Sequence, residues 1–202
     1  MRKLLALVMV LSATGQVLGQ AGPDTNFVLS TGVGGDDDRT NSTNWAGATP
    51  GLVPAIVNSA GISDTARIGP AVAAEAYILR VGWEPLNAFN ATGALTVQGS
   101  LTTGQSVRLG EGPGSNGTLT VEADAVVDNR SSADPGEFWV GSEGTAELFV
   151  SGPINSVSMD ISNNSVSPEL MNATVHVLPG GVIDLTGRLN VGWFGGNASL
   201  IV

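Results

Sequence analysis

The 202-residue chain has no cysteine, one histidine and one lysine. Without cysteine, disulfide scaffolds, thiol catalysis, zinc–thiolate sites and a lipid anchor on an N-terminal cysteine are all excluded. Long apolar runs are also missing. The run from Leu4 to Leu11 is too short to span a bilayer, so the sequence predicts no transmembrane helix.

The N-terminus has the layout of a secretory signal peptide. Met1, Arg2 and Lys3 precede the apolar run, and small and polar residues then lead to Gly19. A positive start, a short apolar core and a small-residue exit are typical of a cleaved export signal, here residues 1–19. We therefore expect a protein that is secreted, extracellular or on the outer cell surface.

Positive charge is scarce in the remaining chain. Removing the signal, with Arg2 and Lys3, takes the formal net charge from −10 to −12. Such a surface repels nucleic acid and anionic membranes, so neither is expected as a partner. Export without disulfides fits an exterior of the Gram-negative type better than a small eukaryotic secreted domain.

What the chain does contain is a short alternating apolar phrase that recurs five times. The first apolar positions of its copies are Leu95, Leu119, Leu148, Val175 and Leu200, at steps of 24, 29, 27 and 25 residues. A unit of this size is too small to bury its own apolar face. It is the length of one coil of a solenoid, whose core forms only when coils stack.

A second phrase ends in glycine and has four copies: Leu79–Gly82, Val107–Gly110, Phe138–Gly141 and Leu189–Gly192. Strict alternation predicts that its apolar residues point inward and that Arg80, Arg108, Trp139 and Asn190 point outward. The closing glycine permits a sharp corner with positive φ. A third, weaker strand phrase lies at Val182–Leu185.

Three short strands per coil predict an all-β protein, a parallel β-helix of about five coils of 24–29 residues over residues 71–202. Residues 20–70 are loop-rich and are expected to cap the first coil, which would otherwise expose core and strand edge. An antiparallel up-and-down sandwich is the alternative, although it needs no fixed period. The glycine-closed phrase is missing between Val150 and Val175, where we expect a protruding loop at Ser162–Leu170.

Three segments, Val140–Gly152, Leu109–Val121 and Leu189–Val202, resemble repeats of secreted bacterial proteins. These are the autotransporter-associated β-strand repeats of exported planctomycete and verrucomicrobial proteins with C-terminal sorting segments of the PEP-CTERM type. Asn44-Trp45, followed by Val-Pro and Asp-Thr-Ala, fits the same family, and the resemblance covers residues 40–202. It implies a right-handed parallel β-helix with a surface or extracellular role and no common catalytic residues. Because the chain stops at Val202 inside a strand phrase, we expect an N-terminal fragment.

No catalytic constellation is predicted from the sequence. Alternation places the single histidine, His176, on an outward row that offers no acidic partner for nucleophilic catalysis. The other members of that row are Thr96, Thr120, Phe149 and Ile201. Glycoside hydrolysis needs two carboxylates across the scissile bond, and no second acid occupies the row of Glu122. A polysaccharide lyase on a β-helix is the enzyme alternative, although the mature chain has no lysine to serve as its base.

Two pairs of residues are the candidate ligand-binding groups. Arg80 and Arg108 occupy equivalent outward positions, where they would bind an anion or pair with a nearby glutamate (Glu75, Glu84 or Glu111). Trp83 and Trp193 each follow a corner glycine, where an indole would stack on a sugar ring or pack against a loop.

Calcium is the one cofactor that the sequence suggests. Asp36, Asp37 and Asp38 supply the hard oxygen ligands that this ion prefers, although their spacing is not that of an EF-hand. The sequence thus predicts a structural or adhesive β-solenoid without catalytic activity, with extracellular polysaccharide or other cell-surface proteins as partners. The alternative is a carbohydrate-active protein, either a glycan-binding module or an enzyme.

Overall fold

A computed structural model describes residues 25–27, 45–46, 59–62, 65–70, 72–83, 91–130, 136–162, 172–193 and 196–202. This part of the chain consists of strands and turns and contains no helix, so no helix in it could cross a membrane. The predicted signal peptide, Asp36–Asp38 and most of the predicted cap lie outside the described residues.

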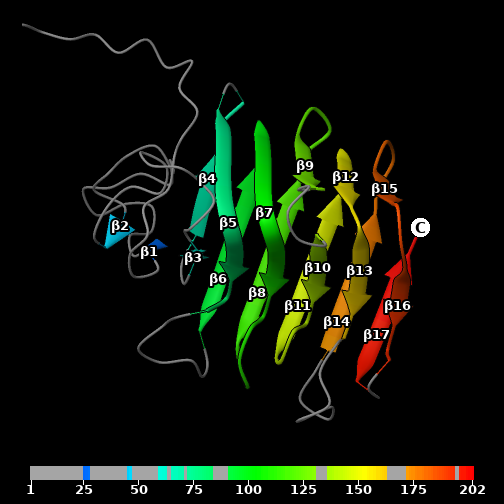
Figure 1. Cartoon of the computed structure of the whole chain (residues 1–202). Helices are drawn as coiled ribbons and strands as arrows, with labels where there is room; N and C mark the ends of the chain where they lie inside the picture. Colours follow the sequence, from blue (N-terminus) through cyan, green and yellow to red (C-terminus); the bar gives the residue numbers. More distant parts are fainter. Residues whose placement is uncertain are drawn as a thin grey trace, which may run out of the picture.

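The strands form two sheets that stack rung upon rung along one axis (Figure 1). The six-stranded sheet contains β4 (Thr65–Ile68), β6 (Thr92–Val97), β8 (Asn116–Val121), β11 (Thr145–Val150), β14 (Asn172–Val177) and β17 (Asn197–Ile201). The eleven-stranded sheet begins with β1 (Thr25–Phe27), β2 (Trp45–Ala46), β3 (Ser59–Ile62), β5 (Ala73–Val81) and β7 (Ser100–Leu109). It continues with β9 (Val126–Asn129), β10 (Glu137–Val140), β12 (Pro153–Ser156), β13 (Ser158–Ile161), β15 (Val182–Leu185) and β16 (Leu189–Val191).

The eleven-stranded sheet bends at a corner, which gives each coil three strands. The first half of β7 pairs with β9 and its second half with β10, so the long strand spans two faces that are separate strands in later coils. The described pairs are parallel except for β1 with β2. The antiparallel sandwich is therefore excluded, and the predicted parallel β-helix is confirmed.

The solenoid has about four turns. The five copies of the alternating phrase are β6, β8, β11, β14 and β17, and their first apolar residues lie in register from Leu95 to Leu200. The predicted count of about five coils therefore differs slightly from the structure. β3, β4 and β5 add their own rungs at the N-terminal side of this stack.

Inward rows of apolar side chains form the core between the faces. Leu119, Leu148 and Val175 stack on successive rungs of one sheet, while Phe138 and Met159 fill the opposite side, and all five are fully buried. Burial of each such side chain is worth about 1.5–3 kcal/mol, but only after the next coil has covered it. This is why a single coil has no stable core of its own.

The predicted corner glycines have the expected backbone. Gly82, Gly110, Gly141 and Gly192 have φ of 72°, 62°, 72° and 69°, the left-handed region that glycine enters without strain. A Cβ on Gly110 would lie 2.3 Å from the carbonyl oxygen of Thr145. Both backbone angle and space therefore require glycine at this corner.

One coil has a serine where the others have this glycine. β13 pairs with β10 so that Met159 lies opposite Phe138 and Ile161 opposite Val140, which places Ser162 at the closing position with φ of 61°. The glycine is therefore absent from this coil, as the sequence predicts. The strand that takes the place of the glycine-closed phrase is β13, in which Met159 and Ile161 point inward, and Ser162 closes the corner.

A polar network is buried at the corner between β9 and β10. Asn129 accepts a hydrogen bond from the Thr103 hydroxyl at 2.5 Å and donates to the Glu137 carbonyl oxygen at 2.9 Å and to Ser156 Oγ at 3.2 Å. The single proton of the Ser156 hydroxyl can go to either of two carbonyl oxygens, that of Gly136 at 3.1 Å or that of Ser158 at 3.0 Å. These inward polar side chains are thus hydrogen-bonded to one another and to backbone carbonyl groups, as buried polar groups must be.

Candidate ligand-binding face

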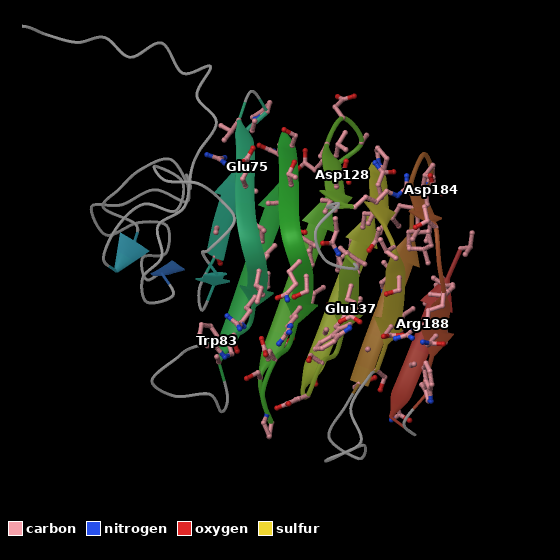
Figure 2. All side chains as sticks on the ribbon, in the orientation of Figure 1. Glu75, Trp83, Asp128, Glu137, Asp184 and Arg188 are labelled. Atoms are coloured by element: carbon pink, nitrogen blue, oxygen red, sulfur yellow. The ribbon has the colours of Figure 1, made fainter. Side chains whose placement is uncertain are left out.

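One outward surface of the solenoid collects most of the residues singled out from the sequence. It is the outer side of the second half of β5 and β7 and of β10, β13 and β16, with the residues that follow the corner glycines; we call it the Arg–Trp face. Its central row, in register on successive rungs, is Arg80, Arg108, Trp139, Asp160 and Asn190. Figure 2 shows Trp83, Glu137 and Arg188 along this face, apart from Glu75, Asp128 and Asp184, which lie nearer the other end of the strands.

Arg80 and Arg108 lie side by side and share one carboxylate. Arg80 Nε is 2.7 Å from Glu111 Oε2, and Arg108 Nη1 is 2.8 Å from Glu111 Oε1. Of the two predicted roles, pairing with a nearby glutamate is the one realised within the protein.

Each of these arginines also stacks on an indole ring. The guanidinium carbon of Arg80 lies 4.5 Å from the centroid of Trp83, and that of Arg108 lies 4.3 Å from the centroid of Trp139. A cation–π contact of this kind contributes about 0.5–1 kcal/mol where it is exposed and more where water is excluded. Trp83, Arg80, Glu111, Arg108 and Trp139 therefore form one continuous group, which we call the Arg–Trp cluster.

A second group lies further along the same face. Asp160 is only 1% exposed although it points outward, because the Asn190 amide donates to its Oδ1 and Arg188 Nη2 lies 3.5 Å from its Oδ2. The guanidinium carbon of Arg188 lies 5.2 Å from the ring centroid of Trp193. Trp193 itself is 55% exposed, so its ring is available to solvent.

The predicted stacking residues belong to a longer series. Trp83 and Trp193 each follow a corner glycine, on the rungs of β5 and β16. Trp139 lies on the rung midway between them, in β10. The three indoles thus occur on every second rung. Alternation had already placed Trp139 outward, and counting rungs from the sequence would have revealed the series.

Asp160 and Glu111 were the residues that sequence reasoning missed as members of one surface. Asp160 was hidden because its phrase ends in serine, although aligning Met159 and Ile161 with Phe138 and Val140 would have found it. Glu111 was named only as one of three glutamates near the arginine pair. The signal in its favour was its position directly after a corner glycine, equivalent to that of Trp83.

The remaining candidates lie on other faces. His176 occupies the predicted outward row and stacks on Phe149, with ring centroids 4.8 Å apart and an interplanar angle of 7°. Glu122 accepts a hydrogen bond from the side chain of Gln98, its neighbour on the preceding rung. Within the described ranges, no group of three or more histidine, aspartate or glutamate side chains could hold a metal ion.

No protein-family model, curated protein or solved structure matches the chain. The class of protein is therefore defined by the geometry alone: an all-β, parallel β-solenoid that presents a row of paired arginine and tryptophan side chains across its rungs.

Proposed function

We propose that this chain is a structural and adhesive β-solenoid that is secreted or lies on the cell surface and has no catalytic activity of its own. The observation that carries the proposal is that the acids Glu111 and Asp160 on the Arg–Trp face are paired with arginines. Glu111 and Asp160 are both held by guanidinium groups, so this surface is a set of paired side chains rather than two carboxylates facing a cleft.

The fold supports such a role. A stack of parallel rungs gives a long, stiff surface on which each outward residue is repeated at a fixed spacing, and binding can then be spread over many weak contacts. The export signal predicted at residues 1–19 would deliver this surface to the exterior. The resemblance to secreted autotransporter-associated repeats suggests the same location, and we propose it on that ground as well.

Fractionation and a retention assay test the proposal together. The full chain is expressed with its own N-terminus in a Gram-negative host, and the N-terminal sequence of the exported product is determined. We expect a product cleaved near Gly19, outside the cytoplasm, that retains whole cells or extracellular matrix when it is immobilised. A protein that stays uncleaved in the cytoplasm, or that retains no more material than bare resin, would contradict the proposal.

A carbohydrate-active protein is the second candidate, favoured by three indoles on one face. Its enzymatic form is tested by incubating the full chain with a panel of polysaccharides and measuring new reducing ends and unsaturated uronates. Time-dependent release that is proportional to protein concentration would establish an enzyme. The non-catalytic form, a glycan-binding module, is compatible with an adhesive role.

A further inference from the structure

We propose that the end of the solenoid formed by β15, β16 and β17 binds a second copy of this chain, which gives a dimer with twofold symmetry. We call these three strands the end rung. In the dimer, β17 of one copy pairs antiparallel with β17 of the other. The inference goes beyond the proposed adhesive role, which a monomer could perform as well.

The end rung exposes side chains whose counterparts on the preceding rung form the core. Among the described residues, the large apolar side chains that are exposed lie between Leu178 and Val202. Leu200 is 37% exposed, whereas Val175, its partner in register, is fully buried. The same contrast holds for Val191, at 47%, and Ile161. The inward rows of the core therefore continue to this end, where no described residue covers them.

An apolar groove opens between the strands of the end rung, which lie together at one end of the stack (Figure 1). Its volume is about 250 Å³, and its lining includes Met159, Ile183, Leu185 and Leu189. Exposed apolar surface of this kind favours association, because burial removes it from water.

The backbone of the end rung is also unpaired on one side. Within the described residues, β17 ends the six-stranded sheet, β15 ends the main path of the other sheet, and β16 pairs only with β13. Such an edge presents N–H and C=O groups to any other strand, and natural proteins block it with charged residues or proline. β17 reads Asn-Ala-Ser-Leu-Ile and contains neither. The chemistry of this edge therefore selects a β-strand as its occupant.

The charge of this end favours a second copy as the source of that strand. Residues 172–202 contain one acid, Asp184, and one base, Arg188, so their formal net charge is zero with His176 neutral. The whole chain carries −10. Two copies of an acidic protein repel each other least where each is neutral, so this end is the one by which they can approach.

The sequence of β17 is self-complementary in an antiparallel pair. A twofold axis through Ser199 places Ala198 opposite Leu200 of the other copy and Asn197 opposite Ile201, which uses the whole strand. Ala198 and Leu200 both continue inward rows, from Ala173 and Val175. A small side chain thus meets a large one on the core side, and the two apolar grooves are brought together.

Sedimentation velocity of the full chain tests the inference over protein concentrations of about 1–100 µM. We expect a monomer that converts to a dimer as the concentration rises. A monomer at every concentration would overturn the inference. Assemblies that keep growing beyond the dimer would overturn it too, because a closed twofold contact leaves no second end rung free.

Charge variants at the twofold axis locate the contact. Ser199 is exposed, so Ser199→Lys and Ser199→Glu leave the core unchanged, and circular dichroism of each variant verifies the fold. Like charges directly opposite each other destabilise a strand pair, and each variant alone is expected to dimerise about tenfold more weakly than the parent. An equimolar mixture of the two variants is expected to restore the dimer, because lysine then lies opposite glutamate.

The matched control is Thr118→Lys, in the same outward row but three rungs away in β8. It is expected to dimerise within about twofold of the parent. Equal dimerisation of Ser199→Lys and Thr118→Lys would overturn the contact at β17, as would a mixture that dimerises no better than its components. Retention of cells or matrix is measured separately, so failure of the dimer and failure of the adhesive role are distinguishable.

Discussion

Replacing Ser162 by glycine is expected to stabilise the protein. Ser162 is the only residue other than glycine with positive φ in the described part of the chain, and it sits where the other coils have glycine. Its side chain is 1% exposed, and its hydroxyl finds no hydrogen-bond partner among the described residues. Both the backbone angle and the buried hydroxyl of Ser162 therefore lower the stability of the folded state. A glycine at this position would avoid both costs.

The magnitude follows from three contributions. The left-handed conformation costs a residue with a Cβ about 1–2 kcal/mol. A buried donor without a partner costs about 1–3 kcal/mol. Glycine loses about 0.4–1 kcal/mol more conformational entropy on folding, which opposes the gain. We expect Ser162→Gly to raise the free energy of unfolding by about 1 kcal/mol or more.

Urea unfolding followed by circular dichroism measures the change, as a higher midpoint at an unchanged slope. The matched control is the reverse substitution at the equivalent corner, Gly110→Ser. There the new Cβ would meet the Thr145 carbonyl oxygen at 2.3 Å, so we expect a loss of about 3 kcal/mol. A lower midpoint for Ser162→Gly at the same slope would refute the placement of Ser162 at the glycine corner.

Three further substitutions probe the corner, the core and the face. Asn129→Ala removes one hydrogen-bond partner each from the Thr103 hydroxyl, the Ser156 hydroxyl and the Glu137 carbonyl oxygen, and should lower the free energy of unfolding by about 2–4 kcal/mol. The control is Asn155→Ala, at an outward position on the next rung, which should change it by less than about 0.5 kcal/mol. Similar losses for the two asparagines would contradict the buried network. Phe138→Ala opens a cavity in the fully buried core and should cost about 3–5 kcal/mol by the same urea assay; a loss below about 1 kcal/mol would contradict the packing. Glu111→Gln removes the carboxylate that Arg80 and Arg108 share and should lower the free energy of unfolding by about 1–3 kcal/mol in the same urea assay, and an unchanged midpoint would contradict the contribution of these ion pairs.

Most of the fold could be predicted from the sequence because the solenoid repeats. Alternation within a strand decides which side chains point inward, and the repeat spacing decides which residues become neighbours on adjacent rungs. The outward row of His176 was predicted in this way, and the register places Thr96, Thr120, Phe149 and Ile201 in it. Neither step needs knowledge of how distant segments pack.

The glycine corners were predictable for a related reason. A sharp corner requires positive φ, and glycine enters that region without strain, so its position marks the end of a strand. Ser162 shows where this reasoning fails. The pairing of β13 with β10 imposes the corner on Ser162. It holds the backbone at a positive φ that is unfavourable for serine.

The buried polar network also depended on the tertiary structure. Thr103, Asn129 and Ser156 are ordinary surface residues by type, and the sequence pattern offers no reason to place them inside. The bend between β9 and β10 brings the carbonyl groups of Gly136 and Glu137 within hydrogen-bond distance of the inward Ser156 hydroxyl and Asn129 amide, so these polar side chains are satisfied although they are buried.

The sequence by itself determined the repeat, favoured a parallel β-solenoid over an antiparallel sandwich, and gave the inward and outward residues of the two repeated phrases. These properties follow from local alternation and from the repeat spacing. Only the tertiary structure decided that Arg80 and Arg108 share Glu111, that each stacks on an indole and that Asp160 is buried beside Arg188 and Asn190. Long side chains at a corner can turn toward several neighbours, and packing across three rungs selects which ion pairs and ring contacts form.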